Sequence, residues 1–197
     1  MSARRSVFAA LALAGAMVTA TISTAATEEA GQGPAFADDP TVLVDTSIGN
    51  NGDGTTFPGA AMPFGMVQLS PDTQLNQYAS YDYGQDTILG FSHTHLSGVG
   101  CPTMGNFRFM PTIGAVASSD PLAYGAKFRH ANEARAPGYY GVTLDNGIQV
   151  ELTATERTGQ HRYTFPAGSE PQNVLVEVGE GNGSTYVGNV RVVGKDT

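Results

Sequence analysis

Apolar and polar residues alternate in short runs along the chain after residue 41, and sustained apolar repeats at the 3.6-residue period of a helix are almost absent. A period of two is typical of strands that bury one face against a core. We therefore predict an all-β protein. The short apolar or alternating segments that predict strands are 66–69, 107–110, 113–116, 139–144, 148–154, 161–165, 174–178 and 186–193.

The clearest predicted element is a hairpin in the segment YYGVTLDNGIQVELTA, residues 139–154. The alternating apolar residues are Tyr140, Val142 and Leu144 on the first strand and Ile148, Val150, Leu152 and Ala154 on the second. Between the strands, Asp145-Asn146-Gly147 supplies residues that tolerate the positive φ of a tight turn. A third strand through 162–165 extends the hairpin into a meander that ends at Pro166, which has no N–H to donate. Two such sheets facing each other predict a β-sandwich.

The first 26 residues have the pattern of a secretory signal peptide: Arg4 and Arg5, then an alanine-rich apolar run, then small residues. Threonines and serine interrupt the run and no stop-transfer charges follow it, so we expect cleavage and no membrane span. The paired arginines leave both twin-arginine and Sec export open. Residues 27–40 are small, acidic and proline-bearing, which predicts a flexible tail, and we assign 41–197 to one secreted or extracytoplasmic domain.

The formal net charge is −8, and removing the two arginines of the signal peptide changes it to about −10. This acidic balance argues against nucleic acid as a partner. Cys101 is the only cysteine in the sequence, so this segment cannot form an intrachain disulfide and depends on its core for stability.

Residues 45–65 are rich in glycine and proline, which predicts a long irregular loop of the kind that often carries function. Within it, Asn50 to Gly54 superficially resembles a calcium loop but lacks the DxDxDG ligand order and the glutamate at position twelve. At the other end, the chain reaches Thr197 directly after a predicted strand, and we expect it to be cut short.

The segment FSHTHLSGVGC, residues 91–101, contains two histidines one residue apart. On an extended segment His93 and His95 face the same way, so they could start a zinc or iron site, hydrogen-bond loop backbone, or contact a ligand. A closed metal site needs further ligands, and no recognised spacing supplies them. The glycines fit neither GxGxxG nor a P-loop, which leaves phosphate binding without support.

Catalytic side chains are not singled out by spacing. Cys101 could act as a nucleophile with a histidine base, but it lies between glycine and Pro102 without a family signature, which favours a small loop residue. A glycosidase needs two carboxyl groups, and the available ones are Asp72, Asp82, Asp86, Glu133, Glu151 and Glu156. Of these, Asp82 is the best candidate for ligand contact because Tyr81 and Tyr83 flank it and could stack on a sugar, although the tyrosines could equally fill a core edge.

Three segments in consistent order resemble glycoside hydrolase family 92, the calcium-dependent exo-α-mannosidases. They are residues 44–73, containing PFGMVQLSPDT, residues 81–114, containing GFSHTHLSG, and residues 128–165, containing the predicted meander. The resemblance covers roughly residues 42–166 and corresponds to the N-terminal domain of the family.

This resemblance implies an N-terminal β-sandwich followed by a larger (α/α)6 barrel, with the active site between them. The implied activity is hydrolysis of terminal α-mannosidic bonds with inversion, by a glutamic acid, an aspartate base and a calcium ion. In the family the catalytic residues and calcium ligands come mainly from the barrel. The resemblance therefore implies a fragment of a bacterial-type secreted enzyme, inactive alone, whose partners are a mannose-containing glycan and the C-terminal catalytic domain. FSHTHLSGVGC would be an interface loop, with His93 and His95 structural or substrate-contacting.

The sequence departs from the family pattern at one position. Members acting on α-1,2-linked mannose often carry a tryptophan between the SPDT and GFSHTH motifs, whereas this chain has LNQYASYDY there and no tryptophan. Tyr78 is the residue that could replace it; otherwise the linkage preference differs. Two alternatives stay open: a stand-alone secreted carbohydrate-binding module, and a small metal-dependent hydrolase that uses His93 and His95.

Overall fold

The computed structural model describes residues 38–98, 103–168 and 170–181, together with 184, 185, 188, 189, 191, 193 and 194. All of them belong to one unit, residues 37–197. The predicted signal peptide, Cys101 and most of the predicted strand at 186–193 lie outside the described residues. Among those described, no helix is long and apolar enough to cross a membrane.

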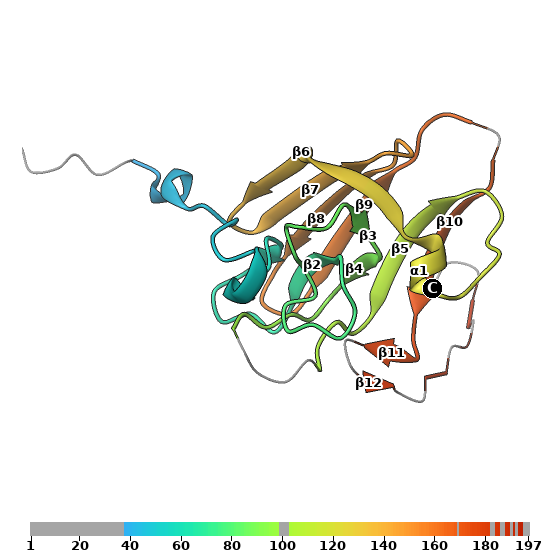
Figure 1. Ribbon diagram of the computed structural model, residues 1–197, viewed down its shortest axis with the longest axis horizontal. Helices are drawn as coiled ribbons and strands as arrows, with labels where there is room; N and C mark the ends of the chain where they lie inside the picture. The colour runs from blue at the N-terminus through green and yellow to red at the C-terminus, as the bar shows by residue number, and fades with distance from the viewer. Residues whose placement is uncertain are drawn as a thin grey trace, which may run out of the picture. The chain divides into compact units, whose positions relative to one another are not determined.

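The described chain is built from two five-stranded sheets, shown in Figure 1. The first sheet has the order β1-β2-β4-β5-β10, and the second has the order β3-β6-β7-β8-β9. All the pairs are antiparallel. The strands of the first sheet are β1 (Ala60–Ala61), β2 (Gln68–Asp72), β4 (Gly90–Ser92), β5 (Arg108–Ile113) and β10 (Gln172–Glu177). Those of the second are β3 (Thr87–Ile88), β6 (Ala126–Ala136), β7 (Tyr139–Leu144), β8 (Gln149–Ala154) and β9 (Gly159–Thr164).

Short elements complete the described chain. They are the 3-10 helices η1 (Pro40–Leu43) and η2 (Gly52–Gly54), the one-turn helix α1 (Pro121–Tyr124), and the small pair β11 (Glu180–Gly181) and β12 (Ser184–Thr185). The fold is therefore nearly all β, which confirms the predicted class.

The predicted hairpin is confirmed in detail. Strands β7 and β8 pair with Val142 opposite Val150, and Gly147 turns the chain at a φ of 86°. β9 extends the pair into the predicted meander. All seven alternating apolar residues of β7, its turn and β8 are buried. Their period-two pattern places one continuous face of the second sheet in the core.

The core lies between the two sheets. Leu69 and Phe91 come from the first sheet, and Tyr140 and Leu152 from the second; all four are fully buried. The sheets approach closely at Gly159 of β9, where an added Cβ would lie 2.9 Å from a methyl carbon of Leu69. Contacts of this kind fill the interior to the density that stabilises a sandwich.

One strand prediction is wrong, and the longest strand was missed. The segment 113–116 is not a strand, because β5 ends at Ile113 and Gly114 leaves the sheet with a φ of 90°. The longest strand, β6, was not predicted, because KFRHANEARA mixes charged and small residues without an apolar period. The register of β6 also shifts between Phe128 and Glu133, so this strand contains a bulge.

Candidate functional site

Three loops are joined by backbone hydrogen bonds and form what we call the loop face: residues 45–57, 73–86, and 93–98 with 103–107. Tyr83 N donates to Asn50 O at 2.7 Å, and Gly98 N donates to Thr55 O at the same distance. The first loop therefore connects the other two. It folds back tightly on itself, since an added Cβ at Gly54 would lie 2.3 Å from the carbonyl oxygen of Gly49. The glycines predicted to mark a functional loop thus have a packing reason.

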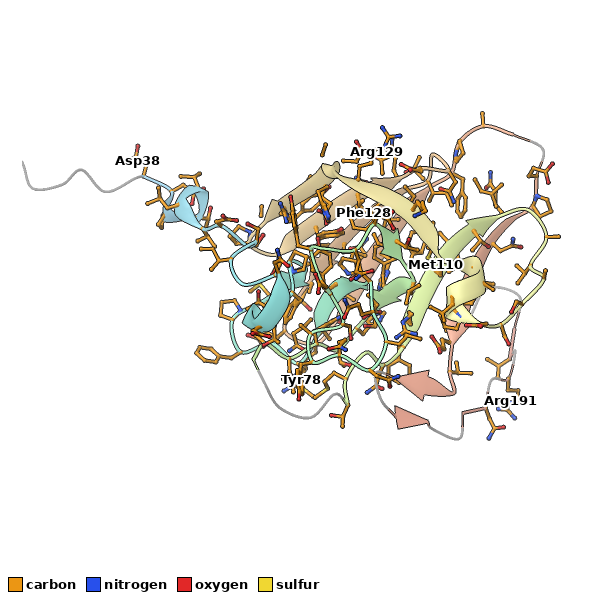
Figure 2. All side chains as sticks on the ribbon, in the orientation of Figure 1. Asp38, Tyr78, Met110, Phe128, Arg129 and Arg191 are labelled. Carbon is orange, nitrogen blue, oxygen red and sulfur yellow. The ribbon has the colours of Figure 1, made fainter. Side chains whose placement is uncertain are left out.

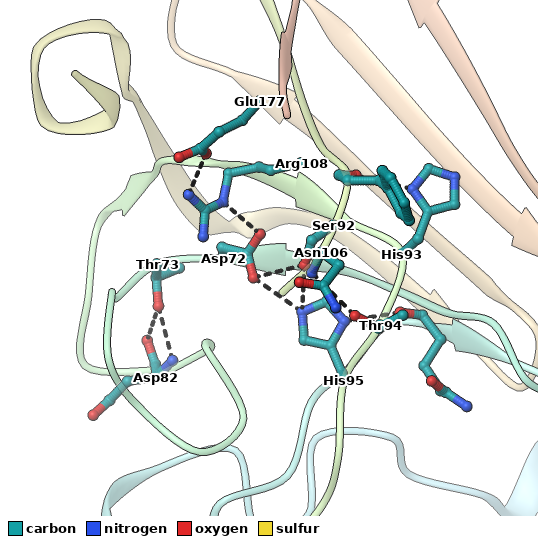
Figure 3. A network of polar contacts seen from close by, with 12 residues as sticks. Asp72, Thr73, Asp82, Ser92, His93, Thr94, His95, Asn106, Arg108 and Glu177 are labelled. Atoms are coloured by element: carbon teal, nitrogen blue, oxygen red, sulfur yellow. Dashed lines mark hydrogen bonds and ion pairs between the residues drawn. The ribbon is translucent and has the colours of Figure 1, made fainter. Parts of the chain in front are cut away.

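A buried network of charges, drawn in Figure 3, adjoins the loop face. Asp72 ends β2 and is completely buried. Its Oδ2 accepts from Arg108 Nε at 3.0 Å, and its Oδ1 lies 3.0 Å from His95 Nε2. Arg108 also donates to Glu177 of β10. The network therefore ties β2, β5, β10 and the third loop together, and we call it the Asp72 network.

The charge of Asp72 is compensated inside the protein. Burial on its own raises the pKa of the Asp72 carboxyl, but the Arg108 guanidinium and His95 outweigh burial and hold this pKa below its ordinary value. Gly90 makes room for this pairing, because an added Cβ would lie 2.4 Å from Arg108 Cγ. Position 90, the start of GFSHTH, therefore has to be glycine, because any side chain there would overlap the aliphatic part of Arg108.

His95 holds the third loop from within. Its ring is 1% exposed, and Nδ1 lies 2.8 Å from the carbonyl oxygen of Gln68 while Nε2 faces Asp72. A carbonyl and a carboxylate are both acceptors, so the ring is held between two groups that accept hydrogen bonds. His95 has no surface to offer a ligand in this structure. Of the roles left open for it, hydrogen bonding within the loop region is the one the geometry supports.

Asp72, His95 and Ser92 are the residue types of a nucleophilic triad, but their arrangement is different. Ser92 Oγ lies 3.2 Å from His95 Nε2, the same nitrogen that faces Asp72. In a triad the serine and the carboxylate bind opposite nitrogens of the imidazole, and the serine is accessible to substrate. Ser92 and Asp72 are fully buried, so these contacts stabilise the fold and position the loop.

His93 lies on the other side of the first sheet from His95, so the prediction that both rings face the same way is wrong. β4 ends at Ser92, and the chain turns before His95. The half-buried ring of His93 packs 4.7 Å from His161 and 5.2 Å from Phe109, between the sheets. Burial lowers the pKa of His93. These two histidines therefore do not combine into one site.

The tyrosines around Asp82 serve the fold more than a ligand in this structure. Tyr81 is buried in the core, and Tyr83 stacks on His130 with ring centroids 3.8 Å apart. Asp82 itself accepts from the backbone N of Gly84 at 2.6 Å, which closes a turn. Tyr78 is half-buried in the loop between β2 and β3 (Figure 2). The roles of Tyr78 and Asp82 toward substrate stay predictions.

Glu133 is a second buried carboxylate. It is one of the available carboxyl groups named from the sequence, but the sequence does not indicate its surroundings. The β6 bulge turns its side chain inward, where it is 0% exposed. Tyr81 and Tyr140 both donate to Oε1, at 3.0 and 2.7 Å, and His130 Nδ1 lies 2.8 Å from Oε2. We call this the Glu133 cluster. No sequence pattern predicts it, because its members come from a loop, a bulge and a strand.

Arg108 could have been found from the sequence. It lies in the apolar run NFRFMPT, where a charge on a strand indicates an inward arginine that needs buried carboxylate partners. The other carboxylates have partners too: Asp86 accepts from Lys127, and Glu151 accepts from Arg162. The described residues contain no group of three or more histidine, cysteine, aspartate or glutamate side chains placed to hold a metal ion.

Comparison with known proteins gives consistent matches. Residues 43–197 match the glycosyl hydrolase family 92 N-terminal domain. An "Uncharacterized secreted glycosidase" of Arthroderma benhamiae is 33% identical over 137 residues, 66% of this chain and 18% of that protein. The family GH92 alpha-mannosidase BT3965 from Bacteroides thetaiotaomicron, solved with mannoimidazole, is 38% identical with a TM-score of 0.59, covering 64% of this chain and 18% of that one.

A further solved relative is the family GH92 inverting mannosidase BT2199 from Bacteroides thetaiotaomicron. It is 31% identical with a TM-score of 0.59, over 68% of this chain and 19% of that chain. This chain therefore spans about a fifth of the length of these relatives. Since the family match covers most of the chain and the fold agrees with solved members, the chain belongs to glycosyl hydrolase family 92, as its N-terminal domain.

Proposed function

We propose that this chain is the N-terminal domain of a secreted α-mannosidase that hydrolyses terminal α-mannosidic bonds with inversion. The observation that carries the proposal is the family match over residues 43–197, together with relatives that are an alpha-mannosidase and an inverting mannosidase. Export is supported by the relative that is a secreted glycosidase. The substrate class is a mannose-containing glycan.

The loop face is the part of this domain that we propose to face the catalytic domain and to wall the sugar pocket. Exposed apolar side chains gather in and beside its loops: Met66 is 70% exposed, Leu96 48% and Phe107 63%. Gln68 N donates to His93 O at 2.9 Å, which joins the segment of Met66 to that of Leu96. Exposed apolar side chains in such numbers are typical of a surface that another domain covers.

Backbone strain supports the same assignment. Phe64, which is fully exposed, and Phe107 have φ values of 59° and 54°, in the left-handed region that non-glycine residues avoid. Each costs on the order of 1–2 kcal/mol. Strained conformations that expose phenylalanine are retained where they serve binding, and the buried Asp72 network beneath the loops provides the rigid base.

The burial of two carboxylates supports a division of roles between this domain and the rest of the protein. The Asp72 and Glu133 carboxylates are buried and bonded to their own neighbours, so we place the catalytic acid and base in the C-terminal part of the protein. We place the calcium ligands of the enzyme mainly there too, as the resemblance to the family implies. This domain would then contribute pocket walls and orientation.

The test is release of mannose from α-1,2-, α-1,3- and α-1,6-linked mannobioses, with and without calcium chelation. The 197-residue chain is compared with a version extended through the downstream reading frame. We expect release only by the extended protein, lost on chelation, with inverted anomeric configuration in the product. Release by the 197-residue chain itself would contradict our placement of the catalytic residues.

A further inference from the structure

On one side of the sandwich, the edge strand of the first sheet has no strand of the second sheet above it in the described part of the chain. In the part of the chain that the structure describes, β9 is the last strand of the second sheet and β10 the last strand of the first. β8 packs over β1 and β2, and β9 reaches β5, where His161 contacts Phe109 with centroids 5.2 Å apart. The next position in the second sheet, beyond β9, would therefore lie over β10.

The inner face of β10 is uncovered as a result. Val176 lies opposite Phe109 in the antiparallel pair, so both side chains point to the same face. That face points inward, because Phe109 reaches His161 of the other sheet. Yet Val174 and Val176 are 45% and 48% exposed, whereas Phe91, on the same face of β4, is fully buried. Two inward valines thus have no strand above them among the strands of the described residues.

β9 borders the same gap from the second sheet. Its inward side chains His161 and Tyr163 are only partly buried, and the buried Nε2 of His161 lacks a hydrogen-bond partner among the described residues. As the last described strand of its sheet, β9 also has backbone N–H and C=O groups on the side away from β8. Edges of this kind are completed by another strand.

We propose that a further β-strand, supplied by the polypeptide after Thr197, adds to the edge of β9 and covers Val174 and Val176. This proposal rests on the proposed function, in which the protein continues into a second domain. The matched part of this chain covers only 18–19% of each relative, so the relatives are much longer than this chain. After β10 the chain returns to the end of this strand, since an added Cβ at Gly188 would lie 1.9 Å from Val178 O.

The chemistry of the added strand follows from the gap. Every second residue should be apolar, to pack on the valines of β10 and on the rings of His161 and Tyr163. A second copy of this chain fits less well, because both copies carry a net charge of −8 and would repel.

Hydrogen exchange tests the proposal. The exchange of β9 amides is compared between the 197-residue chain and the protein extended through its downstream reading frame. We expect the edge-facing amides of β9 to exchange at least about tenfold more slowly in the extended protein. Equal rates in both proteins would overturn the proposal, as would a reading frame that stops at Thr197.

Protection of these amides already present in the 197-residue chain would also overturn it. If that protection rises with protein concentration and light scattering reports a dimer, the occupant is a second copy. If it is independent of concentration, the occupant is a segment within the chain, and truncation after Thr185 removes the protection.

Variants provide a second test. Val176→Asp should lower the denaturation midpoint of the extended protein and speed β9 exchange there, with little effect on the 197-residue chain. Val44→Asp is the matched control, since Val44 is 54% exposed and precedes the loop face. Equal effects of Val176→Asp on both proteins would contradict the proposal. Neither readout involves mannose release, so this proposal and the proposed function can fail separately.

Discussion

The two buried carboxylates of this domain, Asp72 and Glu133, are stabilised in different ways. Asp72 is neutralised by charge: Arg108 and His95 bind its two oxygens. Glu133 accepts from two neutral hydroxyls, those of Tyr81 and Tyr140. His130 Nδ1 lies 2.8 Å from its other oxygen, and its nearest arginine nitrogen, Arg135 Nη1, is 4.0 Å away. Burial and Glu133 raise the pKa of both tyrosines, which therefore remain donors at all ordinary pH values.

The Asp72 network and the Glu133 cluster also stabilise different parts of the domain. The Asp72 network connects strands of the first sheet to the loop face, where we place the contribution to catalysis. The Glu133 cluster joins the β6 bulge to β7 and to the loop residue Tyr81, and so stabilises the second sheet. A charged network loses more when one member is removed, because an unpaired buried charge remains.

The largest predicted effect is for Arg108→Met. This substitution leaves Asp72 without its guanidinium partner and removes a partner of Glu177, so the free energy of unfolding should fall by about 3–5 kcal/mol. Urea denaturation followed by circular dichroism measures it. The control is Arg162→Met, which removes an arginine that is 70% exposed and pairs with Glu151; it should cost at most about 1 kcal/mol. Equal losses would mean that Arg108 does not act through buried charge.

The second effect is pH dependence from His161, between the sheets. Burial lowers the pKa of His161 to about 4. Below pH of about 6.5, His161 of the unfolded chain binds a proton, whereas His161 of the folded chain stays neutral until the pH approaches 4. The free energy of unfolding therefore falls as the pH decreases from about 6.5 toward 4. The loss amounts to about 2–3 kcal/mol after allowance for partial exposure.

His161→Phe keeps a ring beside Phe109 and removes the titration. Urea midpoints measured from pH 7 to pH 4 should therefore fall less steeply for this variant than for the unmodified chain. Parallel pH profiles for the two proteins would show that His161 is not the titrating group.

Smaller effects are expected at Glu133. Glu133→Ala leaves two tyrosine hydroxyls without their acceptor and should cost about 2 kcal/mol. Glu133→Gln retains an acceptor oxygen for both hydroxyls and should cost under about 1 kcal/mol. Thermal unfolding of the two variants measures the difference. If Glu133→Gln destabilises as much as Arg108→Met does, the contrast between charged and neutral stabilisation is wrong.

The sequence predicted the parts of this domain that depend on local pattern. The hairpin of β7 and β8 could be predicted because its buried residues alternate and Asn146-Gly147 specifies the turn. β6 could not, because its inward positions carry His130 and Glu133, whose partners are distant in sequence. A polar residue is predicted to face solvent unless its buried partner is known.

The candidate site shows the same limit. The sequence brings attention to His93 and His95 as a pair, but their opposite orientations depend on where β4 ends, at Ser92. The resemblance to the family suggested the proposed role of the loops, whereas the Asp72 network could be recognised only in the structure. Its members Asp72, His95, Arg108 and Glu177 are up to 105 residues apart in number.

The most direct test of the account compares the two isosteric amides in the extended protein. Mannose release is measured as kcat/KM for Asp72→Asn and Glu133→Gln, at a temperature where circular dichroism shows both folded. The account predicts a loss of about tenfold or more for Asp72→Asn, because the loop face is displaced, and a change within about twofold for Glu133→Gln. Equal activity of the two variants would contradict the claim that the Asp72 network positions the loop face for catalysis.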